Sequence, residues 1–435
     1  KKNVGYIFIV WQILCLMREK TLKDIIIIGL ALFAMFFGAG NLIFPPYLGE
    51  ISGDKWVLGF FCYFIADVGL AILAIIALLR KRNASIEGLV ERIPALPGMA
   101  LAITTELCMG PLLAIPRTAA TTFEMAILPF MPNMNSWVFG AIFFSVTLLL
   151  VLNPTTVVDI IGKYLTPILV IFIFSLLIIG IISPIGEIGQ GISYNVQKDG
   201  ILLGYQTMDV IGAIVLITLI ISTAKDKGYR DRKKMIRVVL KASFLAAALL
   251  FVIYGGLTYL GATTSLKGYE SLNHSALITA ITHELTSKYG LMILGVIVTF
   301  ACLTTAVGIV SAGASFFERI TGGKISYGII VTIIIGMSYI ISNIGLSKII
   351  DFSEPILSVI YPMLLTLIFL TFFDKKIKND NVIKGAVAGA FVTSIFVTLD
   401  ARGLPFEFID YLPLSSIGLG WIVPTILGGL IGRLL

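Results

Sequence analysis

The chain has 435 residues, of which 57% are hydrophobic and only 13% are charged. Water-soluble globular proteins carry about 25% charged residues, so this composition excludes a soluble fold. The net charge of +7 would suit a nucleic-acid-binding protein, but the basic residues lie in short clusters between long apolar segments. We interpret the charge as a sign of membrane topology.

The N-terminal residues 1–16 contain an apolar stretch, Val4–Leu16, that is too short to cross a bilayer. This stretch resembles the apolar part of a signal peptide, but no small-residue cleavage site follows it. Because Met17 stands just before the first full-length apolar segment, we interpret residues 1–16 as a spurious N-terminal extension.

Apolar segments of about 20 residues, the length that crosses a bilayer, follow one another along the rest of the chain. We predict an all-α polytopic membrane protein of about twelve transmembrane helices, because helices satisfy their own backbone polar groups in lipid. Pro111 and Pro116 predict that the third segment is one kinked crossing. The predicted spans are 24–44, 56–79, 99–130, 137–152, 158–182, 193–224, 235–261, 289–317, 325–343, 352–373, 382–400 and 412–432.

Lys and Arg concentrate in alternate loops, chiefly at 80–92, 225–237 and 375–384. Cytoplasmic loops carry the excess of basic residues, so this bias predicts that these three loops are cytoplasmic. The expected location is therefore the cytoplasmic (inner) cell membrane, with several crossings and with both termini inside.

Two predicted spans contain helix-breaking motifs in comparable positions, residues 38–41 and 204–209. A helical Gly costs about 1 kcal/mol relative to Ala, and unwound backbone in a membrane persists only where it lines a cavity or is buried in protein. Paired breaks of this kind mark the binding site of a transporter. The predicted substrate-binding residues are Gly38, Ala39, Gly40, Asn41, Gly204, Tyr205, Gln206, Thr207 and Met208.

The two breaks predict complementary chemistry. Free N–H groups at 38–41 suit a substrate carboxylate, although small residues there also fit close helix packing. Freed carbonyls at 204–207 suit a substrate ammonium group, with Tyr205 and Met208 beside an apolar side chain. Asp209 requires a partner or a proton at this depth, or else serves as a helix cap.

Other polar residues inside the spans allow a functional and a structural interpretation. We expect Arg117 to pair with Glu106 and Glu124 of its own helix, and Asp67 and Glu354 to be structural partners. Thr304 and Thr305 either supply two oxygens to a cation or bond back to the preceding helical turn. The glycine pairs 385/389 and 428/432 have the GxxxG spacing of a packing or oligomer face. Arg117, Lys163 and Asp209 are the candidate coupling or gating residues.

Several segments resemble the branched-chain amino acid transport system II carriers. The clearest is GLALFAMFFGAGNLIFPP at 29–46, and the segments 110–118, 162–167 and 204–209 and the Thr304-Thr305 pair match as well. The resemblance runs from about residue 20 to the C-terminus. It implies uptake of leucine, isoleucine and valine coupled to sodium or, in some members, to protons.

The resemblance also implies the five-plus-five inverted-repeat fold of the sodium-coupled leucine transporter. The repeats would be residues 17–182 and 183–373, followed by two extra helices in 374–435. One sodium site of that fold corresponds here to Ala34, Phe37, Ala301, Thr304 and Thr305.

A second sodium site of that fold uses an Asn in the seventh helix, and because 241–261 contains none, we do not transfer it. Lys163 either replaces sodium, as in a proton-coupled relative, or extends its amine to the membrane surface.

We therefore expect an alternating-access symporter, not an enzyme, with a branched-chain amino acid as substrate and sodium as coupling ion. The alternative is a proton-coupled carrier of other neutral amino acids. An ion channel is disfavoured because no ring-like polar motif repeats, and a membrane enzyme because the spans contain no His. No organic cofactor and no nucleic-acid partner are expected.

Overall fold

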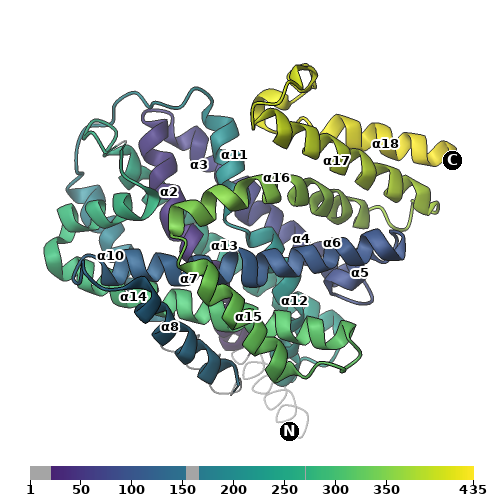
Figure 1. Ribbon diagram of the computed structural model, residues 1–435, viewed down its shortest axis with the longest axis horizontal. Helices are drawn as coiled ribbons and strands as arrows, with labels where there is room; N and C mark the ends of the chain where they lie inside the picture. Colours follow the sequence, from purple (N-terminus) through teal and green to yellow (C-terminus); the bar gives the residue numbers. More distant parts are fainter. Residues whose placement is uncertain (1–20, 153–165, 270) are drawn as a thin grey trace, which may run out of the picture.

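A computed structural model describes residues 21–152, 166–269 and 271–435. This part of the chain is helical, apart from one isolated β-bridge between Gly53 and Gln190 (Figure 1). A first helical segment, Thr21–Phe36, precedes the labelled elements. The labelled helices are α2 (Ala39–Ser52), α3 (Trp56–Phe64), α4 (Leu70–Arg80), α5 (Ile86–Val90), α6 (Ala95–Leu107), α7 (Ala114–Thr122), α8 (Ser136–Val151), α10 (Thr166–Ile182), α11 (Val196–Gln206), α12 (Asp209–Asp226), α13 (Arg232–Ala262), α14 (His274–Ile320), α15 (Tyr327–Ser342), α16 (Leu346–Thr371), α17 (Asp380–Asp400) and α18 (Ile422–Leu434).

The lengths of these helices confirm a polytopic membrane protein. In the described part, seven helices or continuous helical runs are long and apolar enough to cross a bilayer. An eighth crossing is formed if Thr21–Phe36 and α2, which are bent by 69° at their junction, count as one span. Four shorter apolar helices, α8, α10, α15 and α18, fall where further spans are expected. The number of crossings stays a prediction.

Two helices differ in extent from the predicted spans. Helix α14 begins at His274, well before the predicted start at 289, and is interrupted at Ser287, whose φ is 58°. At 1.5 Å per residue, so long a helix exceeds the thickness of a bilayer. Helix α18 begins at Ile422 rather than at 412, because Gly and Pro hold the preceding residues in short turns. The predictions for residues 1–16 and for Lys163 fall outside the described residues.

The third predicted span is one kinked run, as the prolines indicated. Helices α6 and α7 are joined through a π-helical turn, η2 (Cys108–Leu112), and a second π-helical turn, η3 (Phe123–Ile127), ends the run. The kink lies at Gly110, where ψ is −119°, directly before Pro111. Pro removes a backbone donor and clashes with the preceding turn, so the run bends there and turns α7 toward the centre of the molecule.

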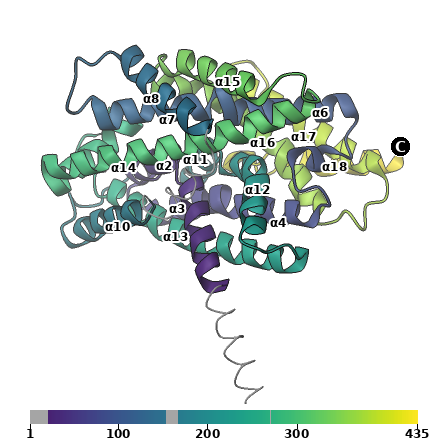
Figure 2. The same cartoon turned by 90° about the horizontal axis from the view of Figure 1, so that it is seen from below.

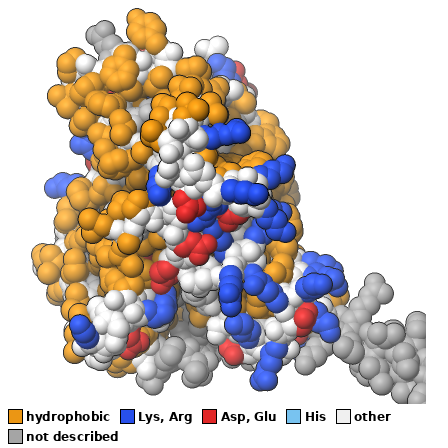
Figure 3. Space-filling model, turned by 90° about the vertical axis from the view of Figure 1, so that its right-hand side faces the viewer, with side chains coloured by type: hydrophobic (Ala, Val, Ile, Leu, Met, Phe, Trp, Pro, Cys, Tyr) orange, Lys and Arg blue, Asp and Glu red, His pale blue; other side chains and the backbone are white. Residues whose placement is uncertain are grey.

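Basic loops that were predicted to share one side of the membrane lie together. Lys81, after α4, contacts Asp374, after α16, at 2.8 Å, and Arg232, at the start of α13, donates to the carbonyl oxygen of Lys81 at 2.6 Å. Arg319, near the end of α14, contacts Glu87 at 3.0 Å. Figure 3 shows Lys and Arg gathered with acidic side chains on this face of the molecule, beside broad hydrophobic areas.

The broken helices lie against their neighbours through glycine. A Cβ built on Gly261 of α13 would stand 1.8 Å from the carbonyl oxygen of Pro46, and one built on Gly49 of α2 would stand 1.9 Å from that of Thr258. In the same way, a Cβ on Gly200 of α11 would meet the α3 backbone at 2.7 Å. These close crossings place α2 and α11 together with α3 and α13 (Figure 1 and Figure 2).

The C-terminal glycine pairs form a packing face inside the chain, one of the two predicted uses. A Cβ on Gly385 of α17 would stand 2.1 Å from the carbonyl oxygen of Gly428, and one on Gly389 would stand 2.5 Å from that of Pro424. Because only hydrogen occupies these positions, the backbones of α17 and α18 come into contact. The two helices lie at one edge of the molecule, beside α16 (Figure 1).

Candidate functional site

The first span breaks at Phe37 and Gly38. The Gly38 N–H donates to the carbonyl oxygen of Phe36 at 2.8 Å, so the carbonyl of Ala34 loses the partner that a continuous helix would supply. Helix α2 then begins at Ala39, and no described side chain caps its start. The first N–H groups of α2 therefore face the break unpaired by the helix, in the arrangement that binds anions.

The sixth predicted span breaks at Thr207 and Met208, inside the predicted segment. Met208 has a φ of 66°, which ends the α-helical path between α11 and α12. Gly204 and Tyr205 remain within α11: Gly204 packs against Ala66, and the Tyr205 ring stacks on Tyr361 at 4.5 Å. The unwound part is thus shorter than the sequence motif. Asp209 is the first residue of α12, not its N-cap.

Asn41 joins the two breaks. Its side-chain amide, only 2% exposed, donates to Asp209 Oδ2 at 2.9 Å and to the Tyr254 hydroxyl at 2.6 Å. Thr207, from the second break, donates to Asp67 Oδ1 at 2.8 Å. The breaks thus face each other across a polar network buried among α2, α12, α13 and the π-helical turn η1 (Ile65–Gly69).

Arg117 reaches this network from α7. Its Nη1 donates to the carbonyl oxygen of Gln206 at 2.6 Å, and its Nη2 donates to that of Thr207 at 3.2 Å. The guanidinium also lies against Gly40, where a Cβ would stand 3.1 Å from Nη2, and 5.6 Å from the centre of the Phe44 ring. One fully charged group therefore contacts the α11 carbonyls and the first turn of α2.

The predicted pairing of Arg117 with acids on its own helix was wrong. Glu124 instead accepts from the Leu346 N–H and from Ser275, and Glu106 keeps a buried oxygen without a partner among the described residues. Seven residues separate Arg117 from Glu124 and eleven separate it from Glu106, which is about 10 and 16 Å along a helix axis. These distances exceed the reach of an ion pair within one helix.

Thr305 faces the first break. Its hydroxyl lies 3.6 Å from the position of a Cβ on Gly38 and, although buried, has no hydrogen-bond partner in the described part of the chain. Thr304 bonds back to the Ala301 carbonyl at 2.8 Å, as the structural interpretation predicts. The first break therefore carries two oxygens that lack their usual partners, the Ala34 carbonyl and the Thr305 hydroxyl, and oxygen is the donor type that suits small cations.

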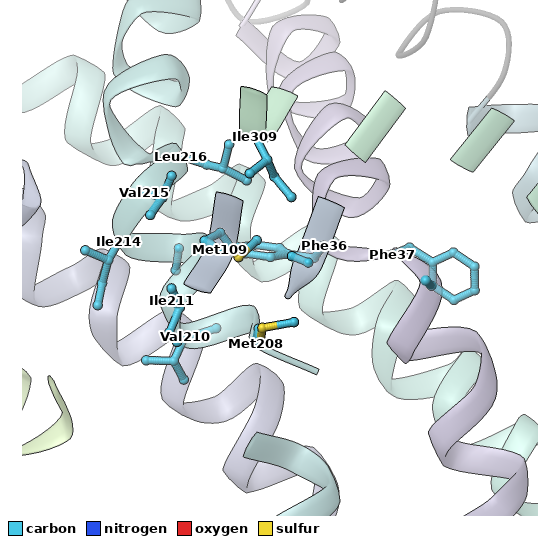
Figure 4. Packing of buried hydrophobic residues seen from close by; sticks show 14 of the residues in the cluster. Phe36, Phe37, Met109, Met208, Val210, Ile211, Ile214, Val215, Leu216 and Ile309 are labelled. Atoms are coloured by element: carbon cyan, nitrogen blue, oxygen red, sulfur yellow. The ribbon is translucent and has the colours of Figure 1, made fainter. Parts of the chain in front are cut away.

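An apolar wall adjoins the breaks. Figure 4 shows Phe36, Met109 and Met208 grouped together, with Phe37 set apart. Met109 and Met208 are almost fully buried, and a Cβ on Gly212 would stand 3.2 Å from the Met109 methyl group. Phe37 stacks instead on Phe33 at 5.3 Å and on Tyr254 at 6.3 Å. Flexible Met side chains can adapt to aliphatic groups of different shape.

Sequence reasoning missed the tyrosines of this site. Tyr63, Tyr254 and Tyr361 are all fully buried near the breaks. A hydroxyl inside an apolar span needs a hydrogen-bond partner, so Tyr254 in the seventh predicted span could have been identified from the sequence as a candidate site residue. The search of that span for an Asn ligand overlooked it.

Solved structures with a similar fold are membrane carriers. The nucleobase-cation-symport-1 transporter Mhp1 in a closed conformation aligns with a TM-score of 0.63 at 11% identity, over 94% of this chain and 91% of that one. MhsT in complex with L-phenylalanine aligns with a TM-score of 0.56 at 16% identity, over 93% and 97%. The chain therefore has the leucine-transporter-like fold.

The sequence comparisons define the family. The family described as "Branched-chain amino acid transport protein" matches residues 21–435. The branched-chain amino acid permease BrnQ of Bacillus subtilis is 37% identical over 96% of this chain and 98% of its own. The permease BraB of the same organism is 37% identical over 95% of each chain. The chain belongs to this branched-chain amino acid transport family, whose members are transporters and not enzymes.

Proposed function

We propose that the protein is a sodium-coupled symporter that takes up leucine, isoleucine and valine by alternating access. The observation that carries this proposal is the pair of facing helix breaks joined by Asn41. In this proposal the breaks open two inverted repeats, 17–182 and 183–373, in the cytoplasmic membrane with both termini inside. The names of the relatives support the substrate class.

The amino acid would bind across the two breaks. Its carboxylate would take the free N–H groups at the start of α2, within reach of the guanidinium of Arg117 beside Gly40. Its ammonium group would take carbonyl oxygens at the end of α11, two of which accept from Arg117 in this conformation. Arg117 would therefore have to shift or share these acceptors when substrate enters.

The substrate side chain would lie against the apolar wall of Phe36, Met109 and Met208. This wall offers no charged partner, so it favours an aliphatic over an acidic or basic side chain. Each additional buried methylene contributes about 0.8 kcal/mol, which distinguishes leucine from alanine more strongly than leucine from isoleucine.

Sodium would bind between the first and eighth spans, at Ala34, Phe37, Ala301, Thr304 and Thr305. The free Thr305 hydroxyl and the interrupted helix at Ala34 support this placement. A cation held there ties α14 to the first span. It couples to substrate only if both ligands prefer the same conformation.

The Thr304→Ala/Thr305→Ala variant is expected to reduce the apparent affinity for sodium about tenfold or more, because each hydroxyl ligand contributes about 1–2 kcal/mol. Leucine uptake into proteoliposomes as a function of sodium concentration measures the change. Thr299→Ala is the matched control, since Thr299 bonds only within its own helix turn at 2.7 Å. Unchanged sodium dependence in the double variant would contradict the assignment.

The substrate is tested by counterflow. Proteoliposomes loaded with unlabelled leucine should accumulate labelled leucine, and unlabelled isoleucine and valine should replace leucine inside the vesicle while lysine and glutamate should not. Exchange that favours aromatic or small neutral amino acids would defeat the substrate assignment. Accumulation driven equally well without sodium by an acidic exterior would support proton coupling instead.

A further inference from the structure

Two acidic side chains meet at the centre of the buried network. Asp67, in η1, is fully buried, and Asp209, at the start of α12, is 5% exposed. The Thr207 hydroxyl joins them, because it lies 2.8 Å from Asp67 Oδ1 and 3.4 Å from the backbone nitrogen of Asp209. Two buried carboxylates that share one site repel each other, so one of the two is expected to carry a proton.

The surrounding donors place the negative charge on Asp209. Asp209 Oδ2 accepts from the Asn41 amide at 2.9 Å, and its position in the first turn of α12 puts it at the positive end of the helix dipole. Asp67 accepts from Thr207 through Oδ1 only, and its buried Oδ2 receives no hydrogen bond from any described donor. A proton on Asp67 Oδ2 removes the negative charge from this unpartnered oxygen.

The local charges balance with this single proton. The charged and titratable groups facing the pair are Arg117 from α7 and the hydroxyls of Tyr63, Tyr254 and Tyr361 from α3, α13 and α16. With one proton on the pair, the charge of Asp209 offsets that of Arg117. With none, a net negative charge would lie in a low-dielectric interior, which is costly.

A tyrosine hydroxyl also lies beside this pair. Tyr63 stands one helical turn before Asp67 on the same face and is fully buried, and its hydroxyl interacts with the Asp67 carboxyl. The hydroxyl can stabilise either protonation state, since it both donates and accepts.

We propose that Asp67 and Asp209 form a proton-binding site that holds one proton in this conformation and exchanges it during transport. Asp209 and the donors Asn41 and Thr207 belong to the broken segments, whereas Asp67 belongs to the continuous run Trp56–Arg80. Movement of the breaks would separate these two sets and change the affinity for the proton. This exchange rests on the proposed alternating access. The presence of one proton in the conformation described here does not depend on it.

Infrared spectroscopy of the full-length protein in lipid tests the resting state. A protonated carboxylic acid has a carbonyl stretching band that carboxylates and amides lack. The Glu50→Gln/Glu106→Gln background removes the two other described acids that are at most 5% exposed. At neutral pH this background should retain a deuterium-sensitive band that disappears in Asp67→Asn and in Asp209→Asn but persists in the surface control Asp374→Asn. A missing band, or one that survives both pair variants, would overturn the proposal.

The pH dependence of leucine transport tests the exchange. In the wild type, kcat/KM should fall about tenfold per pH unit once the proton is lost. Asp67→Asn, which cannot ionise, should flatten this fall. Equal slopes in the two proteins would overturn the exchange. Loss of leucine counterflow in the wild type would defeat the proposed function while leaving the infrared result intact.

Discussion

Replacement of Arg117 by glutamine is expected to abolish most leucine uptake. The side chain holds the carbonyl oxygens of Gln206 and Thr207 at 2.6 and 3.2 Å and lies against Gly40 of α2. The guanidinium is also within reach of the proposed substrate carboxylate, and losing a hydrogen bond from a charged donor, about 1.5–3 kcal/mol, should reduce kcat/KM by about tenfold or more. Initial rates of labelled leucine uptake in proteoliposomes measure the loss.

Arg117→Lys should fail nearly as badly, because an ammonium group cannot reproduce the two-pronged contact of a guanidinium. The matched control is Arg319→Gln. Arg319 forms a surface pair with Glu87 at 3.0 Å, and such pairs contribute about 0–1 kcal/mol. Uptake at the wild-type rate in Arg117→Gln would show that the guanidinium is not part of the site.

Gly261→Ala is expected to disrupt the crossing of α2 and α13. The added methyl group would stand 1.8 Å from the carbonyl oxygen of Pro46, a backbone atom that can move only with its helix. Overpacking typically costs about 1–3 kcal/mol, and here it would also displace the helix that carries Gly40 and Asn41. Both the melting temperature of the purified protein and its leucine uptake should fall.

Gly336→Ala is the control for this substitution. Gly336 lies within α15 and nothing approaches the position of its Cβ within 4 Å. Alanine is favoured over glycine in a helix by about 1 kcal/mol, so this variant should be as stable as the wild type or slightly more so. Equal melting temperatures for Gly261→Ala and the wild type would mean that the two helices do not pack this closely.

Local features of the sequence predicted the broken elements well. Two glycines next to Asn41, and Pro111 next to Gly110, weaken a helix wherever it is placed, and the structure breaks or kinks at both. The sequence placed the beginning of the break in the sixth span too early, because a glycine such as Gly204 is compatible both with a helix break and with a close helix crossing. Only the presence of Ala66 against it decides between them.

Contacts between distant segments could not be predicted in this way. Arg117 was assigned partners on its own helix, whereas its acceptors lie about 90 residues away on another one. Likewise, Asn41 bonds to Asp209 and Tyr254, which are 168 and 213 residues distant. Sequence periodicity identifies which residues share a helix face, but not which face of which other helix they meet.

Met208 gives the second break a mechanical property. A residue with a side chain in the left-handed conformation costs about 1–2 kcal/mol relative to a right-handed helix, and Met208 sits there at a φ of 66°. Any conformation in which α11 and α12 join as a regular helix therefore avoids this cost. The difference is equivalent to about a tenfold change in the population of that conformation. Met208→Gly should remove this cost and favour the conformation described here. The accessibility of engineered cysteines on either side of the membrane would measure this change in population. An unchanged pattern would show that the conformation of Met208 does not affect the transport cycle.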